Sequence, residues 1–480
     1  MSTNEKKDGT GGYKGKSLEL FSGKDITVGD TISVNTVDNN LVDGILMPRY
    51  ESADDDHIVI KLKSGYNIGI ETTTIQSIVK IMPCPDQPIL EMKSAYSHYS
   101  KGGTETEEVV DNKREHSCDL LPNIALISTG GTIASKVDYR TGGVHSVLSA
   151  SDLYASIPEL RKYALVDPEV ILNEYSENLK PEHWTLIANK VAEKIKSGIY
   201  RGIIISHGTD TMHYTASALS FALPNPPVPV VLVGAQRSSD RPSSDAALNL
   251  IGATVFCIKS DYSGVFVVMH AGPSDDVIAC HVGTRVRKNH TSRRDAFESI
   301  DMEPIALVKG DIVEMQVQPQ PQVKLNQRND TSIDFLVRPA FDRRVTLIKF
   351  HPGFDPRLLA DGVMRLDYKA VILEGTGLGH ISKECIPEIR KIIDSGIMVF
   401  MTSQCIWGRT RMTVYDTGRD LLKIGVIPLS DMMPETALVK AMWVVANSKD
   451  REYSKQIMQQ SIANEISSVI PFTDKGIYHD

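Results

Sequence analysis

The stretch that decides the fold is NIALISTGGTIASKVDYRTGG, residues 123–143. Its apolar, β-branched run ends in Ser-Thr-Gly-Gly-Thr, a pattern typical of a buried strand that turns sharply at its carboxyl end. Similar runs follow, YRGIIISHG, VPVVLVGAQ and GVFVVMH, and helical patterns such as PEHWTLIANKVAEKIKSG lie between them. Strands that are apolar on both faces and alternate with helices predict a parallel sheet in an α/β domain.

Two further regions flank this domain. From Arg343 onward, RVTLIKF, YKAVILEG and GIMVFMTSQ alternate with IPEIRKIIDSG and PETALVKAMWVVA, which predicts a second α/β lobe. Upstream, five short β-like segments between Ile26 and Ile81 predict a small β-barrel. The predicted organisation is a disordered tail (1–16), a small β-barrel (17–84), a linker or surface arm (85–120), a large α/β domain (121–337) and a C-terminal α/β lobe (338–480).

The composition narrows the class of protein. The chain has 480 residues, of which 41% are hydrophobic and 23% charged, and a net charge of -8, so any nucleic acid contact is expected to be local. Its six cysteines form no C-x-x-C pair, which disfavours a zinc site or a disulfide framework. The N-terminus lacks the apolar core of a signal peptide, and no apolar stretch reaches the roughly 18 residues of a membrane helix. We therefore expect a soluble cytoplasmic protein.

Three strand ends carry the candidate chemistry, since ligands of parallel sheets bind beyond the carboxyl ends of the strands. They are STGGT, SHGTDT and VGAQRSSDRPSSD. Thr132 in the first is either a helix cap or a nucleophile. A nucleotide-binding loop is disfavoured because Gly131 stands where a Walker loop requires lysine. The acid-rich SADDDH, residues 52–57, is expected to be a solvated charge run, and we predict no metal site.

The second end, HGTDT, sets the hydroxyl of Thr209 beside the carboxylate of Asp210, although helix capping would explain the same pair. A threonine hydroxyl is a poor nucleophile until a neighbouring group takes its proton. The basic segment TRVRKNHTSRRDAF, with charges from Arg285 to Arg294, supplies candidates. Most of these charges are expected at the surface or against a partner, and one desolvated lysine next to Asp210 would be the functional exception.

The motifs STGGTIAS, HGTDT, VGAQR and MHAG together resemble the type I/II L-asparaginase family, over roughly residues 121–460. The resemblance implies that the threonine after the double glycine, Thr132 and not Thr129, is the nucleophile. It also implies a second triad of Thr209, Asp210 and Lys288, the last lying seven residues before DAF.

The same resemblance implies the substrate-binding residues. In SENLKPEHW, Ser176 lies eight positions before Trp184 and corresponds to the serine that holds the substrate carboxylate and amino group. Glu177 stands where many bacterial asparaginases carry glutamine, and its charge suits a substrate ammonium. Tyr139 corresponds to the tyrosine of the lid loop.

The barrel and linker, with SQCIWGRTRMTVYDTGRDL and PETALVKAMW, resemble more specifically the D subunits of archaeal heterodimeric glutamyl-tRNA(Gln) amidotransferases. That resemblance implies a subunit that hydrolyses glutamine or asparagine and passes ammonia to a partner, the E subunit. The partner would use ATP and Mg to convert Glu-tRNA(Gln) to Gln-tRNA(Gln) and would make most tRNA contacts, so we expect no cofactor in this chain.

The expected assembly is a heterodimer, or a dimer of heterodimers, with a homodimer formed through the asparaginase-like lobes. In such a homodimer each site would be closed by the neighbour's C-terminal lobe, with contacts from EGTGLGH, residues 374–380. The barrel is expected to dock the partner or stabilise the dimer rather than bind tRNA. The alternatives are a free-standing cytosolic L-asparaginase and a non-catalytic scaffold subunit.

Overall fold

The computed structural model describes residues 13–21, 24–38, 40–47, 55–62, 67–82, 121–131, 135–137, 144–146, 157–237, 244–316 and 323–469. These belong to two compact units, residues 1–121 with 137–143 and residues 122–136 with 144–480. The expected nucleophile Thr132 and the expected lid residue Tyr139 lie outside the described residues. So do most of the expected tail and the whole of the expected linker, 85–120.

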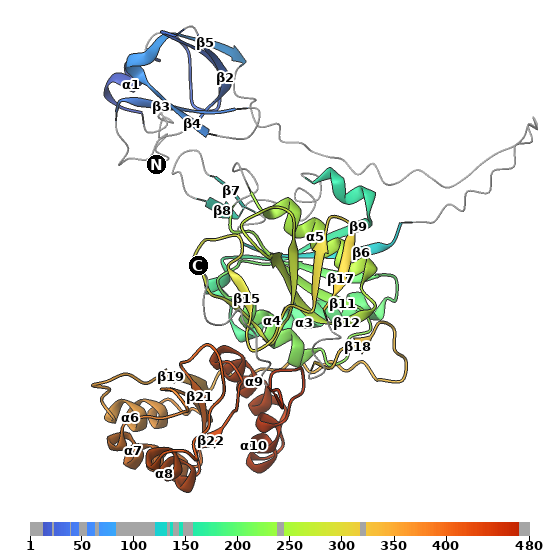
Figure 1. Ribbon diagram of the computed structural model, residues 1–480, viewed down its shortest axis with the longest axis vertical. Coiled ribbons are helices and arrows are strands. Elements are labelled where there is room, and N and C mark those ends of the chain that lie inside the picture. The colour runs from blue at the N-terminus through green and yellow to red at the C-terminus, as the bar shows by residue number, and fades with distance from the viewer. Residues whose placement is uncertain are drawn as a thin grey trace, which may run out of the picture. The chain divides into compact units, whose positions relative to one another are not determined.

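The N-terminal unit contains the five short strands that the sequence predicts, in antiparallel order β4-β3-β2-β1-β5. Their bounds are β1 Thr31–Thr36, β2 Leu41–Leu46, β3 His57–Lys61, β4 Asn67–Glu71 and β5 Ile75–Met82, preceded by helix α1, Gly15–Glu19. Alternate residues such as Ile32, Val34, Ile58 and Ile60 are buried, and the strands curve around them (Figure 1). Tyr13 packs in the same core, and its buried hydroxyl donates a hydrogen bond of 2.6 Å to the Met47 carbonyl.

The large domain is built on one sheet of order β17-β16-β13-β12-β11-β10-β6-β9, with β18 paired to β12. Its strands are β6 Asn123–Gly130, β9 Leu165–Glu174, β10 Gly202–Ser206, β11 Pro229–Val233, β12 Tyr262–His270, β13 Ile278–Val282, β16 Ala306–Lys309, β17 Ile312–Met315 and β18 Asn326–Gln327. The five strands from β9 to β12 are parallel, as predicted. The sheet as a whole is mixed, because β13, β16 and β17 extend its parallel part in antiparallel fashion. The β12–β13 and β16–β17 connections are too short for the crossover helix that a parallel pair needs.

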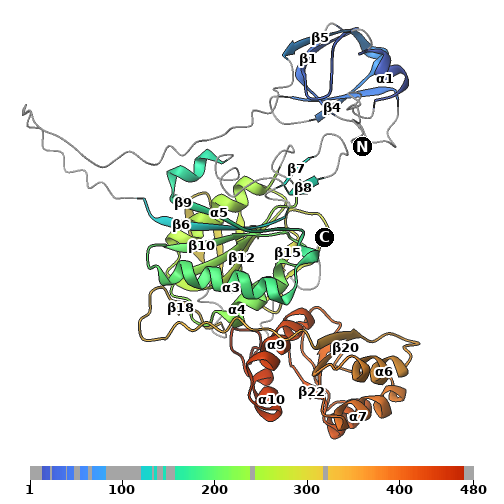
Figure 2. The same cartoon turned by 180° about the vertical axis from the view of Figure 1, so that it is seen from behind.

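Helices cover both faces of the parallel part (Figures 1 and 2). Helices α3, Pro181–Lys196, and α4, Met212–Ala222, pack on one face, and α5, Ala246–Lys259, packs on the other. Successive strand residues divide between these faces, since Ile204 packs on the α5 side and Ile203 on the α3 and α4 side. A separate two-stranded ribbon consists of β14, Val286–Lys288, and β15, Phe297–Ser299. The remaining short elements are β7 Ser135–Val137, which pairs with β8 Val144–Ser146, and the turns η3 Pro158–Lys162 and η4 Ser176–Asn178.

The C-terminal lobe has the predicted parallel sheet, in the order β19-β20-β21-β22. Its elements are β19 Val345–Lys349, α6 Arg357–Arg365, β20 Ala370–Gly375, η5 Lys383–Cys385, α7 Ile386–Asp394, β21 Met398–Ser403, α8 Asp416–Ile424, β22 Ile427–Pro428, α9 Pro434–Asn447 and α10 Arg451–Gln459. Helices α6, α7 and α8 cover one face, and α9 covers the other (Figure 1).

One hydrophobic cluster joins this lobe to the large domain. Phe221 of α4 packs against Trp443 of α9, with ring centroids 6.0 Å apart, and Trp184 of α3 belongs to the same cluster. The indole nitrogen of Trp443 donates to the Arg338 carbonyl at 2.9 Å, so this large side chain is buried without an unsatisfied donor. The two lobes therefore share a core.

Candidate active site

The carboxyl ends of β6 and β10 meet at one edge of the sheet. The strands run in register from Ile124 opposite Gly202 to Ser128 opposite Ser206, so their following residues are neighbours. Gly131 has φ of +83°, and a Cβ built there would lie within 2.5 Å of the Gly208 Cα. Glycine is required at 131 both for this backbone conformation and for this close approach.

The end of β9 reaches the same place. Ser176 is buried directly after β9, and a Cβ at Gly208 would lie 2.8 Å from the Ser176 Cβ. The Thr211 hydroxyl donates to the Ser176 carbonyl at 2.7 Å, which ties this turn to the segment after β10. The neighbouring Glu177 is exposed. The structure thus brings the expected substrate-binding pair beside the two strand ends.

Lys288 lies at the centre of the described site. Its Nζ donates to the Thr209 hydroxyl oxygen at 2.8 Å and to Asp210 Oδ1 at 2.7 Å. The Lys288 side chain is 8% exposed, whereas that of Asp210 is 67% exposed. The Thr209 side chain is buried, and its oxygen accepts a hydrogen bond from Lys288. Its own hydroxyl proton is therefore free to be donated to another acceptor. Three predicted residues from two distant segments therefore form one hydrogen-bonded group.

The other threonine of the opening motif has a structural partner. The Thr129 hydroxyl is buried and donates to the Ser206 carbonyl at 2.9 Å, which links β6 to β10. This bond occupies the Thr129 proton.

Two histidines beside the site are neutral near pH 7. Burial lowers the pKa of His207 to about 4, against a weaker opposing hydrogen bond to the Gly208 carbonyl. Burial, followed by the positive charges of Arg287 and Lys288, lowers the pKa of His213 to about 3. Neutral imidazoles add no positive charge that would compete with the Lys288 ammonium.

A buried polar network holds the segment that follows β11, the third of the strand ends. Its residues Asp245, Asn249 and His270 were not singled out from the sequence. The Asp245 carboxylate accepts the backbone N–H of Gln236 and of Arg237 at 3.0 Å. It also accepts the side-chain amide of Asn249 at 3.0 Å, and Asn249 in turn contacts His270 Nδ1 at 2.6 Å. The aspartate lies just before α5 in the quoted segment, and that position is the signal that points to it.

The basic segment is less exposed than expected. Most of its charges were expected at the surface or against a partner, but Arg285 is fully buried and pairs with Asp431 of the C-terminal lobe. Arg287 pairs with Glu435 at 3.0 Å. Arg293 and Arg294 pair with Asp295 and Asp275 within the large domain.

Within the described ranges, no group of three or more His, Cys, Asp or Glu residues is arranged to hold a metal ion. A search of the same residues finds no helix whose length and apolarity would let it cross a bilayer.

Comparison with known proteins identifies the class of fold. The family models that match are Asparaginase, N-terminal (residues 123–321), the Glutaminase/Asparaginase C-terminal domain (344–458) and the GatD N-terminal domain (26–81). The thermostable L-asparaginase from Thermococcus kodakarensis superposes with a TM-score of 0.64 at 34% identity, covering 72% of this chain and 100% of that chain. The fold and the strand-end site together define an asparaginase-type α/β enzyme.

Relatives that match nearly the whole chain narrow this class. The glutamyl-tRNA(Gln) amidotransferase D subunit of Pyrococcus furiosus is 43% identical over 96% of this chain and 99% of its own length. The D subunit of the Methanopyrus kandleri amidotransferase is 42% identical over 95% and 94%. The chain belongs to the family of glutamyl-tRNA(Gln) amidotransferase D subunits, which confirms the resemblance inferred from the motifs.

Proposed function

We propose that this chain hydrolyses the side-chain amide of glutamine, or of asparagine, and delivers the ammonia to a partner subunit. The observation that carries the proposal is the buried Lys288 ammonium held between Thr209 and Asp210, beside the Gly131 turn at the carboxyl edge of the sheet. Such a group can handle the protons that a threonine nucleophile requires. The near full-length similarity to amidotransferase D subunits supports the same function.

The nucleophile in this proposal is Thr132, which directly follows Gly131. Its hydroxyl oxygen attacks the amide carbon and loses its proton, and the C–N bond breaks as the nitrogen leaves protonated as ammonia. Water then hydrolyses the ester to the free acid and regenerates the hydroxyl. Backbone N–H groups at the glycine turn stabilise the oxyanion, each by about 3 kcal/mol.

Thr209, Asp210 and Lys288 supply the proton handling and part of the substrate binding. Because Lys288 donates to the Thr209 oxygen, Thr209 can donate its own proton to the leaving amide nitrogen. Asp210 is largely exposed and carries a negative charge that suits the substrate α-ammonium. Ser176 and Glu177 bind the carboxylate and ammonium end, and Tyr139 belongs to the lid.

The partner in the proposal is an amidotransferase E subunit, which uses ATP and Mg to form Gln-tRNA(Gln) and makes most tRNA contacts. We propose a dimer of heterodimers in the cytoplasm, with a homodimer formed through the asparaginase-like lobes. The likeness to a free-standing L-asparaginase covers 72% of this chain, whereas the separate N-terminal match at 26–81 favours the amidotransferase. The turnover of the isolated chain separates these two functions. Poor turnover that the partner and tRNA restore would favour the amidotransferase over the free-standing L-asparaginase.

The decisive experiment uses Thr132→Ala and Thr209→Val in complex with the partner subunit, supplied with either glutamine or free ammonium. We expect glutamine-dependent amidation to be lost and ammonium-dependent amidation to be kept. Thr129→Val is the matched control, because it removes a buried hydroxyl that binds Ser206 and costs about 1 kcal/mol of stability without touching the chemistry. Full glutamine-dependent activity in both variants would refute the assignment and favour the scaffold alternative.

A further inference from the structure

The strand that carries Lys288 is too small to hold itself in place. Strand β14 has three residues and pairs only with the three residues of β15 among the described strands, with Arg287 opposite Glu298 and Lys288 opposite Phe297. An isolated two-stranded ribbon is at best marginally stable in water. The position of the Lys288 ammonium must therefore depend on what else contacts this ribbon.

Alternation along the strand divides its side chains between two sides. Val286 is buried in the core of the large domain, and Lys288, two residues on, reaches Thr209 and Asp210 of the same domain. Arg285 and Arg287 lie on the opposite side, and both pair with acidic residues of the C-terminal lobe. The ribbon is thus held between the two lobes.

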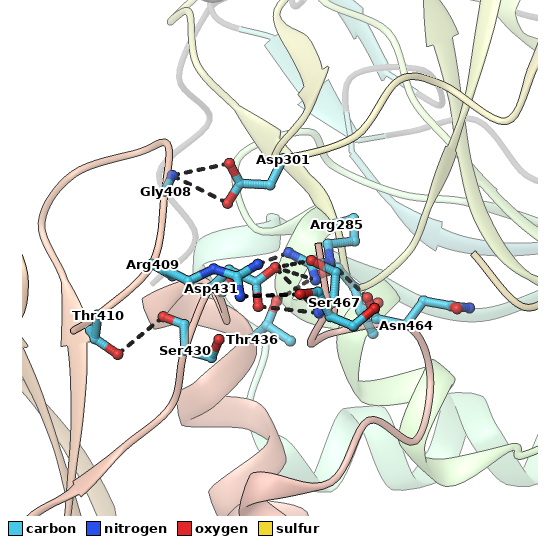
Figure 3. Close-up of polar contacts among 12 residues, drawn as sticks. Arg285, Asp301, Gly408, Arg409, Thr410, Ser430, Asp431, Thr436, Asn464 and Ser467 are labelled. Carbon is cyan, nitrogen blue, oxygen red and sulfur yellow. Dashed lines mark hydrogen bonds and ion pairs between the residues drawn. The ribbon is translucent and has the colours of Figure 1, made fainter. Parts of the chain in front are cut away.

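The Arg285 contact is a polar network around a fully buried ion pair with Asp431 (Figure 3). The guanidinium donates to Asp431 Oδ2 at 2.9 Å, to the Asp431 carbonyl at 3.1 Å and to the Asn464 carbonyl at 2.7 Å. Ser467 donates to the same carboxylate through its backbone N–H, at 3.2 Å, and through its hydroxyl. Burial opposes the charge on Asp431, but Arg285 and Ser467 outweigh it and hold the pKa of that carboxyl below its usual value.

The Arg287 contact leads to the first turn of α9. Its guanidinium lies 3.0 Å from Glu435 Oε1. The next residue of that helix, Thr436, donates to the Thr284 carbonyl at 3.1 Å, just before the ribbon. After the ribbon in the sequence, the Asp301 carboxylate accepts a hydrogen bond from the Gly408 backbone N–H at 3.0 Å (Figure 3). The C-terminal lobe therefore contacts the ribbon before, within and after β14.

We propose that Asp431 and Glu435 of the C-terminal lobe are positioning residues for Lys288. They hold Arg285 and Arg287, and so set the distance from the Lys288 ammonium to Thr209. The inference rests on the proposed function of Lys288 and adds that the C-terminal lobe controls the geometry of that group. Since a displacement of about 1 Å at a catalytic group can lower a rate by about 100-fold, loosening this anchorage is expected to lower turnover.

The test uses the complex with the partner subunit and compares Glu435→Ala, Asp431→Asn and the exchanged pair Arg287→Glu/Glu435→Arg. We expect Glu435→Ala to lower the glutamine-dependent kcat about 10-fold with little change in KM, and to shift the pH at which kcat is half-maximal. The exchanged pair restores the charge contact and should recover most of the loss. Ammonium-dependent activity should be unchanged in every variant, which shows that the complex is folded and assembled.

Arg328→Gln is the matched control for loss of stability alone. Arg328 donates to the carbonyls of Ser260, Arg201 and Cys257 and does not belong to the ribbon or its anchors. This variant should lower the melting temperature and leave kcat and its pH profile unchanged.

Two results would overturn the inference. The first is that Glu435→Ala keeps the wild-type kcat and pH profile, and that Asp431→Asn does so too. If Asp431→Asn does not fold, the result for Glu435→Ala decides alone. The second is a loss in Arg328→Gln as large as that in Glu435→Ala at equal stability. Lys288→Met separates the two hypotheses: full activity in that variant refutes the proposed function itself, whereas its inactivity beside active anchor variants refutes only the positioning role.

Discussion

Replacing Lys288 by glutamine tests the centre of the site. The substitution keeps much of the side-chain length but removes the ammonium that donates to Thr209 and to Asp210. Thr209 then loses the charged donor that orients its oxygen. We expect glutamine hydrolysis to slow, with little effect on folding, because Lys288 lies on the separate β14–β15 ribbon and not in a hydrophobic core.

The structure sets the expected size of the loss. A hydrogen bond that involves a charged group contributes about 1.5 to 3 kcal/mol. We assign this full contribution to the hydrogen bond between Lys288 and Thr209, because both side chains are largely buried. We assign little to the ion pair with Asp210, because the Asp210 side chain is 67% exposed and screened by water. At about 1.4 kcal/mol per factor of ten, loss of the Thr209 bond lowers kcat/KM about 10- to 150-fold. Lys288→Arg should restore the charge but not the geometry.

The assay measures glutamate release from glutamine by the complex, together with ammonium-dependent amidation of Glu-tRNA(Gln). Lys309→Gln is the matched control, since Lys309 also pairs with a carboxylate, Glu314 at 2.9 Å, but at the surface and without a hydroxyl partner. The reasoning is refuted if Lys288→Gln loses less than about threefold in kcat/KM, or if the ammonium-dependent activity falls equally.

Three further predictions concern the scaffold. Gly131→Ala should abolish most glutamine hydrolysis, because its Cβ would meet the Gly208 backbone. Gly198 also has positive φ but faces open space, so Gly198→Ala should lower the free energy of unfolding in urea by only about 1 kcal/mol. Equal effects of the two substitutions on hydrolysis and on unfolding would contradict the close approach. Lys440→Met should lower the free energy of unfolding by about 3 to 5 kcal/mol, because it leaves the charge of the fully buried Glu465 without its counter-ion. Lys440→Met/Glu465→Gln should recover part of this loss. An unchanged free energy of unfolding in Lys440→Met would contradict the prediction. Burial lowers the pKa of His281 to about 4, so below its ordinary value of 6.5 the unfolded chain binds a proton that the folded chain does not. Stability should therefore fall as pH drops from about 6.5 to about 4, by about 1.4 kcal/mol per unit for this residue, and His281→Gln should have a shallower slope in thermal melts; an unchanged slope would contradict it.

The sequence was most informative where the signal is local. Apolar runs such as GIIIS predicted the parallel strands because a strand buried on both faces needs no polar residue within it. The hydroxyl, carboxylate and glycine residues at the strand ends predicted the place of the site, since parallel strands end at one edge. The antiparallel strands β13, β16 and β17 could not be separated from the parallel ones, because periodicity does not encode strand direction.

The sequence by itself determined the alternating α/β plan, the strand-end position of Thr209 and Asp210, and the family to which the chain belongs. Only the tertiary structure decided that Lys288, 78 residues beyond Asp210, lies 2.7 Å from it. It also decided that Arg285, in a segment most of whose charges were expected at the surface or against a partner, is buried against Asp431, 146 residues away. The physical reason is that patterns of burial repeat along neighbouring residues, whereas a pairing between distant charges is set by the way two lobes pack together and exclude water.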